Sequence, residues 1–292
     1  MIKKIKMAHP KYQTKELCEV FSVPTSTYYD QVKEKPISAK KQQMLRIIKQ
    51  TAIETNHSYG KRRMKKQLNN EGFNIGKYKA ASLMKEANIV AIRPKKKHQY
   101  PDGGISNTKV GNVLNRQFNQ PQANTHWVTD ITYIRNHQCW SYLAAVLDLG
   151  AKEIVGWALS KTPDAQLATL ALKNAINRKR PMTSNLLVHS DQGTQYTSNM
   201  FDVYCDQLKI TRSMSRRGNC WDNAVMERFF RNLKTERLNT LSFINHEAVI
   251  AEVESYIYFY NYKRLNSAIG YTTPNKKYNE LKKQPKNVSG KT

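Results

Sequence analysis

The spacing of hydrophobic positions changes near Trp127, and this change divides the chain. Beyond it, three successive runs rich in β-branched and aromatic residues predict strands, and helical periodicity then alternates with short apolar runs. The predicted strands span residues 127–135, 140–148, 153–159, 186–189 and 210–214. The predicted helices span residues 165–176, 198–208, 222–237 and 246–260. Three consecutive strands followed by alternating helices and strands predict an α/β domain with a mixed five-stranded sheet and flanking helices.

The N-terminal part of the chain shows helical periodicity instead. Residues 12–21 and 25–29 flank a break at residues 22–24. A helix, a short turn and a second helix that opens with small polar residues are typical of a helix-turn-helix, although an ordinary helical hairpin gives the same pattern. A second helical unit follows at residues 59–68 and 75–89. We therefore predict an all-α N-terminal region with helix-turn-helix-type units.

The second helical unit carries a dense row of cations, namely Lys61, Arg62, Arg63, Lys65 and Lys66. Such a run is often only a solvated helix face. The whole chain favours another interpretation, because 48 Lys and Arg against 22 Asp and Glu give a net charge of +26. Residues 1–122 alone hold 25 Lys and Arg against 8 Asp and Glu. Because cations that neutralise phosphates release counterions, we predict that these five side chains contact double-stranded DNA.

Composition divides the chain into four segments. We predict a helical DNA-binding region over residues 1–92, a basic flexible linker over 93–122, an α/β core with a C-terminal helix over 123–281, and a disordered basic tail over 282–292. The scattered cysteines Cys18, Cys139, Cys205 and Cys220 have no CxxC spacing, which argues against a structural zinc site. No apolar run reaches membrane-spanning length, and the first residues lack the hydrophobic segment of a signal peptide, so we expect no secretion signal. We expect a soluble cytoplasmic protein with no membrane partner.

Three carboxylates stand in distinctive contexts. Asp130 lies in a predicted strand, Asp191 follows a short buried strand, and Glu227 lies in a predicted helix, with thirty-five residues between Asp191 and Glu227. Acids gathered from separate elements form an oxygen-only site suited to Mg²⁺, and two such ions balance three carboxylates and one phosphodiester. We therefore predict that Asp130, Asp191 and Glu227 are catalytic metal ligands for phosphoryl transfer on nucleic acid.

Other side chains near these acids have competing interpretations. Asp148 ends the second predicted strand, and we expect it either to have a structural role or to support the metal ligands without binding the metal. His189 is better suited to brace Asp191 by a hydrogen bond than to act as a general base, because metal-assisted chemistry needs no histidine to ionise the attacking group. Trp127 is expected in the core, whereas Trp221 suits DNA contact and core packing equally.

The residues around the three acids resemble those of one protein family. The shared blocks are Trp127-x-x-Asp130-x-Thr132, His189-Ser-Asp191-Gln-Gly-x-Gln-Tyr196, Ser213-x-Ser215-x-x-Gly-Asn-Cys-x-Asp-Asn-Ala-x-x-Glu227-x-Phe-Phe, Leu233-Lys-x-Glu236, Tyr260-Asn-x-x-Arg264 and Thr273-Pro274. They resemble the catalytic core of the insertion-sequence-3 family of bacterial transposases, which are relatives of retroviral integrases. The helical N-terminal part resembles the second reading-frame product of that family. Asn266 departs from the family pattern, since a histidine is frequent there.

The resemblance implies an RNase H-like fold, with Asp130 on the first strand, Asp191 after the fourth and Glu227 on a helix. It implies a DDE-type enzyme that nicks insertion-sequence ends at their terminal inverted repeats and joins the freed 3′-hydroxyl to target DNA. Two Mg²⁺ ions are implied as cofactors, with Mn²⁺ as a substitute. The family further implies several copies assembled on DNA at the bacterial nucleoid, and an upstream reading-frame product as a candidate partner.

Side chains around the acids receive supporting roles. We expect DNA contacts from Arg228, Arg231, Lys234 and Arg264. We expect support of the carboxylates from His189, Gln192, Asn219 and Asn223. Either Asp222 or Asn223 is expected to cap the helix that carries Glu227. A nuclease without strand transfer and a DNA-binding regulator with an inactive core are the competing classes.

Overall fold

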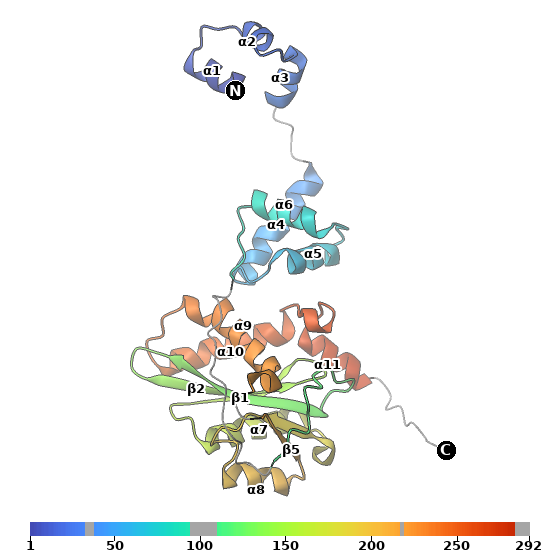
Figure 1. Cartoon of the computed structure of the whole chain (residues 1–292), viewed down its shortest axis with the longest axis vertical. Coiled ribbons are helices and arrows are strands. Elements are labelled where there is room, and N and C mark those ends of the chain that lie inside the picture. Colours follow the sequence, from blue (N-terminus) through green and yellow to red (C-terminus); the bar gives the residue numbers. More distant parts are fainter. Residues whose placement is uncertain (33–37, 94–109, 217–218, 284–292) are drawn as a thin grey trace, which may run out of the picture. The chain divides into compact units, whose positions relative to one another are not determined.

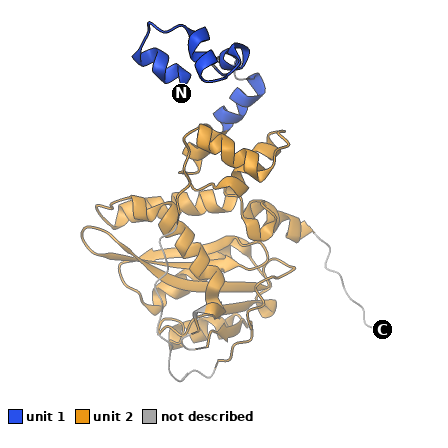
Figure 2. Ribbon diagram, turned by 45° about the horizontal axis from the view of Figure 1, so that its top comes forward, with its two compact units in different colours: residues 1–47 blue, residues 48–292 orange. Residues whose placement is uncertain are grey.

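The computed structural model describes residues 1–32, 38–93, 110–216 and 219–283. They fall into two compact units, Met1–Ile47 and Ile48–Thr292 (Figure 2). Residues 94–109 of the linker predicted over 93–122, and residues 284–292 of the tail predicted over 282–292, lie outside the described residues. Across the described ranges, no helix is long and apolar enough to cross a membrane.

The first unit is a group of short helices. Its elements are α1 (Ile2–Ala8), α2 (Thr14–Val20) and α3 (Thr25–Val32). Ile2, Leu17 and Cys18 form their buried core. The helices predicted over residues 12–21 and 25–29 are confirmed as α2 and α3. The following helix, α4 (Ala39–Glu54), runs across the boundary between the units.

The second unit opens with a helical segment and continues into the sheet domain. After α4 come α5 (Lys61–Asn70) and α6 (Lys77–Glu86). Met64 and Leu68 of α5 and Ala80 and Leu83 of α6 are buried, because these positions recur at helical spacing on one face. Gly72, with φ of +88°, allows the chain to turn after α5.

The sheet has five strands in the order β3-β2-β1-β4-β5. They are β1 (His126–Arg135), β2 (Trp140–Asp148), β3 (Ile154–Ser160), β4 (Leu187–Ser190) and β5 (Thr211–Met214). β1 is antiparallel to β2 and parallel to β4, and β4 is parallel to β5. This is the mixed sheet of the predicted RNase H-like fold.

Helices cover both faces of the sheet (Figure 1). They are α7 (Ala165–Lys179), α8 (Asn199–Gln207), α9 (Ala224–Glu236) and α10 (His246–Tyr262), followed by α11 (Pro274–Lys283). Successive strand residues face opposite sides. Trp127 and Val146 therefore pack in one core with α7 and α8, while Val128 and Ala145 pack in another with α9 and α10. Close packing of α7 requires Gly156 on β3.

Candidate active site

Asp130 and Asp191 lie level with each other on neighbouring strands. Asp130 is within β1, and Asp191 directly follows β4. These strands are parallel, and Val128 pairs with His189, so each acid stands two residues beyond a paired position. Both carboxylates accept a backbone N–H through Oδ1, Asp130 from Ile131 at 2.7 Å and Asp191 from the residue two positions on at 3.0 Å. Positions 61 residues apart are thus brought together by strand pairing.

Glu227 approaches these acids from the helix layer. It lies in the first turn of α9. The start of this helix is fastened to β1, because Asn223 Nδ2 donates a hydrogen bond to the Thr129 carbonyl at 3.2 Å. The Glu227 charge acts on Asp130, whose pKa it helps to raise. Strand pairing and helix packing therefore bring three carboxylates into electrostatic contact.

The surroundings of Asp130 and Asp191 disfavour the ionised form of both carboxyl groups. Burial raises the pKa of Asp130 to about 8, with repulsion by Asp191 as the next cause and a further contribution from Glu227. The Ile131 N–H and Lys234 oppose this rise. Burial also raises the pKa of the Asp191 carboxyl. Asp130 therefore needs a proton or a nearby cation to be stable at neutral pH.

The donor set fits a hard divalent cation by its chemistry. All three groups are carboxylates, and a bound cation relieves their mutual repulsion. Asn223 adds a buried side-chain oxygen without a hydrogen-bond partner at the start of α9. In the side-chain arrangement of the described residues, no three His, Cys, Asp or Glu side chains converge closely enough to hold a metal ion. The oxygen-only set is present, but its members do not surround a common point.

His189 differs from its predicted role. The ring is buried on β4, with Nδ1 2.8 Å from Ser213 Oγ and Nε2 3.0 Å from Ser215 Oγ. The prediction that it braces Asp191 is wrong, because both ring nitrogens already have partners. Burial lowers the pKa of His189 to about 4, so the ring is neutral at pH 7. Nearby, Gln192 Nε2 donates to the Ser215 carbonyl at 2.9 Å.

Asp222 organises the segment that precedes α9. Its buried carboxylate accepts hydrogen bonds from Arg216 Nε at 3.0 Å and from Arg116 Nε at 2.6 Å. Although burial raises the pKa of Asp222, these bonds lower it well below its usual value. Asn219 Oδ1 accepts from Arg116 Nη2 at 2.8 Å. The predicted side-chain cap of α9 is wrong, since Asp222 binds the arginines and Asn223 turns to β1.

Arg264 lies in the interior and not on a DNA-facing surface. It is 2% exposed, and its Nε and Nη2 donate to Glu236 at 2.7 and 2.6 Å. Tyr256 donates to the same carboxylate at 2.9 Å, and Arg63 Nη1 lies 3.5 Å from it. We therefore correct the predicted DNA contact of Arg264, because a phosphate would have to displace a buried carboxylate. Glu236 is the last residue of α9.

The other predicted DNA contacts have varied exposure. Lys61, Arg62, Lys66, Arg228 and Arg231 are exposed, while Arg63, Lys65 and Lys234 are half-buried. Lys234 Nζ lies 4.6 Å from the centre of the Tyr133 ring, and its charge acts on Asp130. Contact of these side chains with DNA stays a prediction.

The competing interpretations near the site are resolved for three residues. Asp148 is buried and accepts hydrogen bonds from Trp127 Nε1 at 3.2 Å and from the Ala151 N–H at 2.7 Å, so it is structural as predicted. Trp127 is fully buried in the core, also as predicted. Trp221 is 65% exposed, which eliminates core packing for its indole.

Sequence reasoning did not single out Tyr196. Its buried hydroxyl lies 3.1 Å from Thr129 Oγ1, next to Asp130 in the chain. Burial raises the pKa of Tyr196, and the charges of Asp130 and Asp191 add to this. The Tyr196 hydroxyl therefore stays protonated near Asp130 and Asp191. Its place at the end of the block that begins at His189 was the available signal.

Known proteins resemble the chain over most of its length. Two family profiles, each described as "Integrase core domain", match residues 120–220 and 208–274, and one described as "HTH-like domain" matches residues 39–97. The insertion element IS600 uncharacterized 31 kDa protein of Shigella sonnei is 36% identical over 273 residues, covering 91% of this chain and 99% of that protein. Transposase InsF for insertion sequence IS3A of Escherichia coli strain K12 is 33% identical over 273 residues, covering 90% and 93%.

A solved structure to which the fold is similar is that of the HTLV-2 integrase catalytic core domain in complex with magnesium in its dimeric form. It is 15% identical with a TM-score of 0.42, covering 54% of this chain and 97% of that chain. Within the helical region, the HTH-like match starts at residue 39. It therefore covers the second predicted helical unit and not the first.

Proposed function

Because the chain belongs to the insertion-sequence-3 family of transposases, we propose that Asp130, Asp191 and Glu227 hold two Mg²⁺ ions and carry both DNA cleavage and strand transfer. Membership of this family makes the chain a DDE-type polynucleotidyl transferase that acts in DNA integration. The assignment of the three residues is supported above all by the β1–β4 register, which aligns Asp130 with Asp191, and by the effect of Glu227 on Asp130.

The reaction has two balanced steps. In the first, water attacks a phosphodiester at the element's end, the bond from phosphorus to O3′ breaks, and a 3′-hydroxyl is released. In the second, that hydroxyl attacks a target phosphodiester, so one P–O bond forms and the bond from phosphorus to the target O3′ breaks. The attacking hydroxyl gives its proton to solvent, and the leaving O3′ takes up a proton from solvent. Two Mg²⁺ ions, held by Asp130, Asp191 and Glu227, would supply positive charge that offsets the negative charge of the reacting phosphodiester. Because phosphodiester bonds are exchanged in strand transfer, that step needs no nucleotide hydrolysis.

The chain's own residues orient the reacting groups. The three carboxylates supply the oxygen ligands, and Asp130 must lose its proton before it can bind a cation. Lys234 lies on the same helix as Glu227, and its charge interacts with Asp130. We expect this cation to contact the scissile phosphate. Arg228 and Arg231 are exposed on α9 and are suited to hold the DNA backbone on either side.

The partners follow from the reaction. We expect the terminal inverted repeats and the target duplex to bind through the basic N-terminal region and the cations of α9. We propose that at least two copies of the chain assemble on one DNA complex, because two ends must be handled together. An upstream reading-frame product is proposed as a further partner, and Mn²⁺ as a substitute cofactor.

The test is a strand-transfer assay with the purified full-length chain, Mg²⁺ and a labelled duplex from the end of the encoding element. Wild type is compared with Glu227→Gln, which keeps the shape of the side chain and removes its charge. Glu247→Gln is the matched control, because Glu247 is an exposed acid in the first turn of α10. We expect joined product from wild type and control, and none from Glu227→Gln, with equal DNA binding by all three.

Other outcomes identify the competing classes. Cutting without joining by wild type would indicate a nuclease. Binding without chemistry by wild type, repeated with the upstream product added, would indicate a regulator. Joining by Glu227→Gln at the wild-type rate would remove this residue from the proposed metal site.

A further inference from the structure

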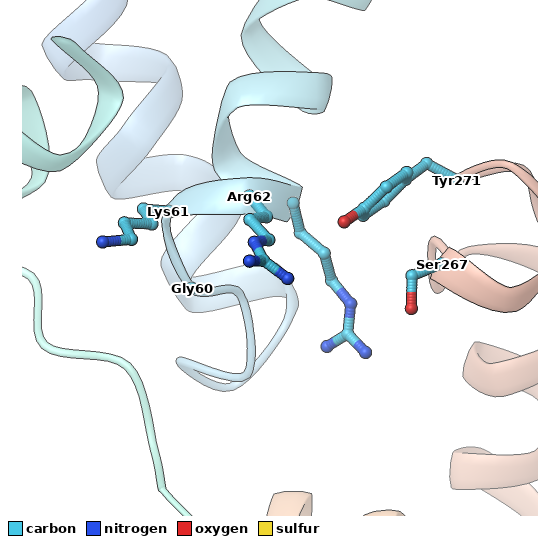
Figure 3. Close-up of a pocket in the computed structure, with 6 residues that line it drawn as sticks. Gly60, Lys61, Arg62, Ser267 and Tyr271 are labelled. Atoms are coloured by element: carbon cyan, nitrogen blue, oxygen red, sulfur yellow. The ribbon is translucent and has the colours of Figure 1, made fainter. Parts of the chain in front are cut away.

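A basic pocket of about 410 Å³ lies between α5 and the turn that follows α10, and we call it the α5 pocket. It is lined by Gly60, Lys61, Arg62, Arg63, Ser267 and Tyr271 (Figure 3). Three of these residues are cations, two carry hydroxyl groups, and none is acidic. This composition selects an anion that can accept several hydrogen bonds.

One wall of the α5 pocket is the start of α5. The N-cap residue Gly60 offers no side-chain cap, and the first turn of the helix contains no acidic residue. The backbone N–H groups of this turn therefore remain as donors in addition to Lys61 and Arg62, whose side chains are exposed. No carboxylate of the helix's own first turn competes with a ligand for these groups.

The opposite wall is a turn built by Asn266. The Asn266 N–H donates to the Thr272 carbonyl at 3.0 Å, and the Asn266 carbonyl accepts from the Tyr271 N–H at 2.9 Å. Its side chain accepts from the Ala268 N–H at 3.0 Å. Gly270 and Tyr271 have φ of +76° and +58°, and the latter is unusual for a tyrosine. The turn holds the Tyr271 hydroxyl toward the α5 side (Figure 3).

The two walls are fixed relative to each other. Tyr59, just before α5, accepts a hydrogen bond from the Leu265 N–H at 2.8 Å through its hydroxyl. The Asn56 side chain donates to the Glu236 carbonyl at 2.8 Å. The α5 pocket is therefore formed before any ligand arrives, which lowers the entropic cost of binding.

Positive charge in the α5 pocket is incompletely balanced. Among the residues that the structure describes, Glu236 is the one acidic neighbour of Arg63, at 3.5 Å, and that carboxylate is already bound by Arg264 through two hydrogen bonds. Burial lowers the pKa of Arg63, and repulsion by Arg264 lowers it further. A phosphate in the pocket would supply the missing negative charge. Because Lys61, Arg62 and Ser267 are exposed, an extended strand can pass through the site.

We propose that the α5 pocket binds one backbone phosphate of DNA. The inference rests on the proposed function and adds to it the place where one strand is held by both the HTH-like segment and the segment after α10. Lys61, Arg62 and Arg63 supply charge, and Ser267 and Tyr271 donate hydrogen bonds to the phosphate oxygens. A bound phosphate shares Arg63 with Glu236, so DNA binding here is linked to the C-terminal end of α9.

The test pairs protein variants with DNA that lacks single charges. The full-length chain is titrated with end duplexes in which one phosphate at a time is replaced by a neutral methylphosphonate. Wild type is compared with Arg62→Gln, and with Lys173→Gln as the control, since Lys173 is an exposed cation on α7. Tyr271→Phe removes one hydroxyl without changing charge.

At one position, we expect the methylphosphonate to weaken DNA binding by wild type and by Lys173→Gln about tenfold. DNA binding by Arg62→Gln should be almost unaffected by the same replacement. We also expect Arg62→Gln to reduce the slope of log affinity against log salt by about 1. Tyr271→Phe should weaken binding several-fold with an unchanged slope. In a separate experiment, the stability of wild type and of Arg62→Gln is measured with added inorganic phosphate at constant ionic strength. This experiment tests whether the α5 pocket binds a free anion instead of DNA.

The outcomes separate this inference from the proposed function. If wild type binds and joins DNA but no methylphosphonate position is coupled to Arg62, the α5 pocket does not hold a DNA phosphate. If inorganic phosphate stabilises wild type and not Arg62→Gln, again without such coupling, the pocket takes a free anion and the inference is also overturned. If wild type fails to bind the end duplex at all, the proposed function fails with it.

Discussion

Glu236 allows the sharpest test of how α9, the helix that carries Glu227, is held. Its buried carboxylate accepts two hydrogen bonds from Arg264 and one from Tyr256, and Arg63 lies nearby. Replacing Glu236 by Gln keeps the volume but removes the negative charge. Arg264, which is only 2% exposed, would then be a buried cation without a counterion. Breaking a buried ion pair in this way costs about 3–5 kcal/mol.

The assay is urea unfolding followed by tryptophan fluorescence. All four tryptophans of the chain lie in the second compact unit, so the signal reports that unit and not residues 1–47. With a denaturant dependence of about 3 kcal/mol per M, the expected loss lowers the urea midpoint of Glu236→Gln by about 1–1.7 M. Glu254→Gln is the control, because Glu254 is an exposed acid on α10.

A double-mutant cycle isolates the pair from other effects of the substitution. Arg264→Met removes the buried cation, and the double variant removes both charges. We expect the double variant to be more stable than the sum of the two single losses predicts, because neither charge is then left unpaired. Equal midpoints for Glu236→Gln and Glu254→Gln would refute the reasoning, since the buried pair would then contribute nothing to the stability of the unit.

Two further predictions concern the close packing of the sheet and the segment before α9. Gly156→Ala should lower the free energy of unfolding by about 1–3 kcal/mol, seen as a lower urea midpoint. The reason is that the added Cβ would lie 2.4 Å from the Ala175 backbone nitrogen. An unchanged midpoint would mean that α7 moves away from the sheet without a loss of stability. Hydrogen bonds from Arg216 and Arg116 hold the pKa of Asp222 below its unfolded value despite burial, so its stabilising contribution is present above about pH 4 and is lost as the pH falls further. Urea midpoints measured from pH 7 to pH 3 should therefore fall less steeply in Asp222→Asn, which starts from a lower stability at pH 7.

Local pattern was sufficient to predict the strands and most helices of the second unit. β2 begins and ends at the predicted residues, and β1 differs by one residue at its start. The signal is strong here because buried strands concentrate β-branched and aromatic residues. The start of α9 was predicted less well, since residues 220–223 form a separate 3₁₀ turn. That boundary depends on Asp222, whose partner Arg116 lies 106 residues upstream.

The candidate site shows the same division between local and distant information. The motifs around Asp130, Asp191 and Glu227 marked the acids themselves, and the resemblance to a family gave them roles. The partners of His189 were not predictable, because they are serines on and after β5, 24 and 26 residues away. The DNA contact predicted for Arg264 was wrong for the same reason, because its partner Glu236 lies 28 residues away in the sequence. Arg264 belongs to one of the blocks shared with the family, and a cation in such a block suits a DNA contact until packing shows which carboxylate it binds.

The two charge clusters together explain how Glu227 is placed. Before α9, Asp222 binds Arg116, which comes from the segment preceding β1. At the last residue of α9, Glu236 binds Arg264 and lies 3.5 Å from Arg63 of α5. Between these anchors, the buried face of α9 packs against the sheet through Met226, Phe229, Phe230 and Leu233. A helix held at both ends and along one face has little freedom to slide, so the position of Glu227 relative to β1 depends on arginines outside the sheet as well as on the sheet itself.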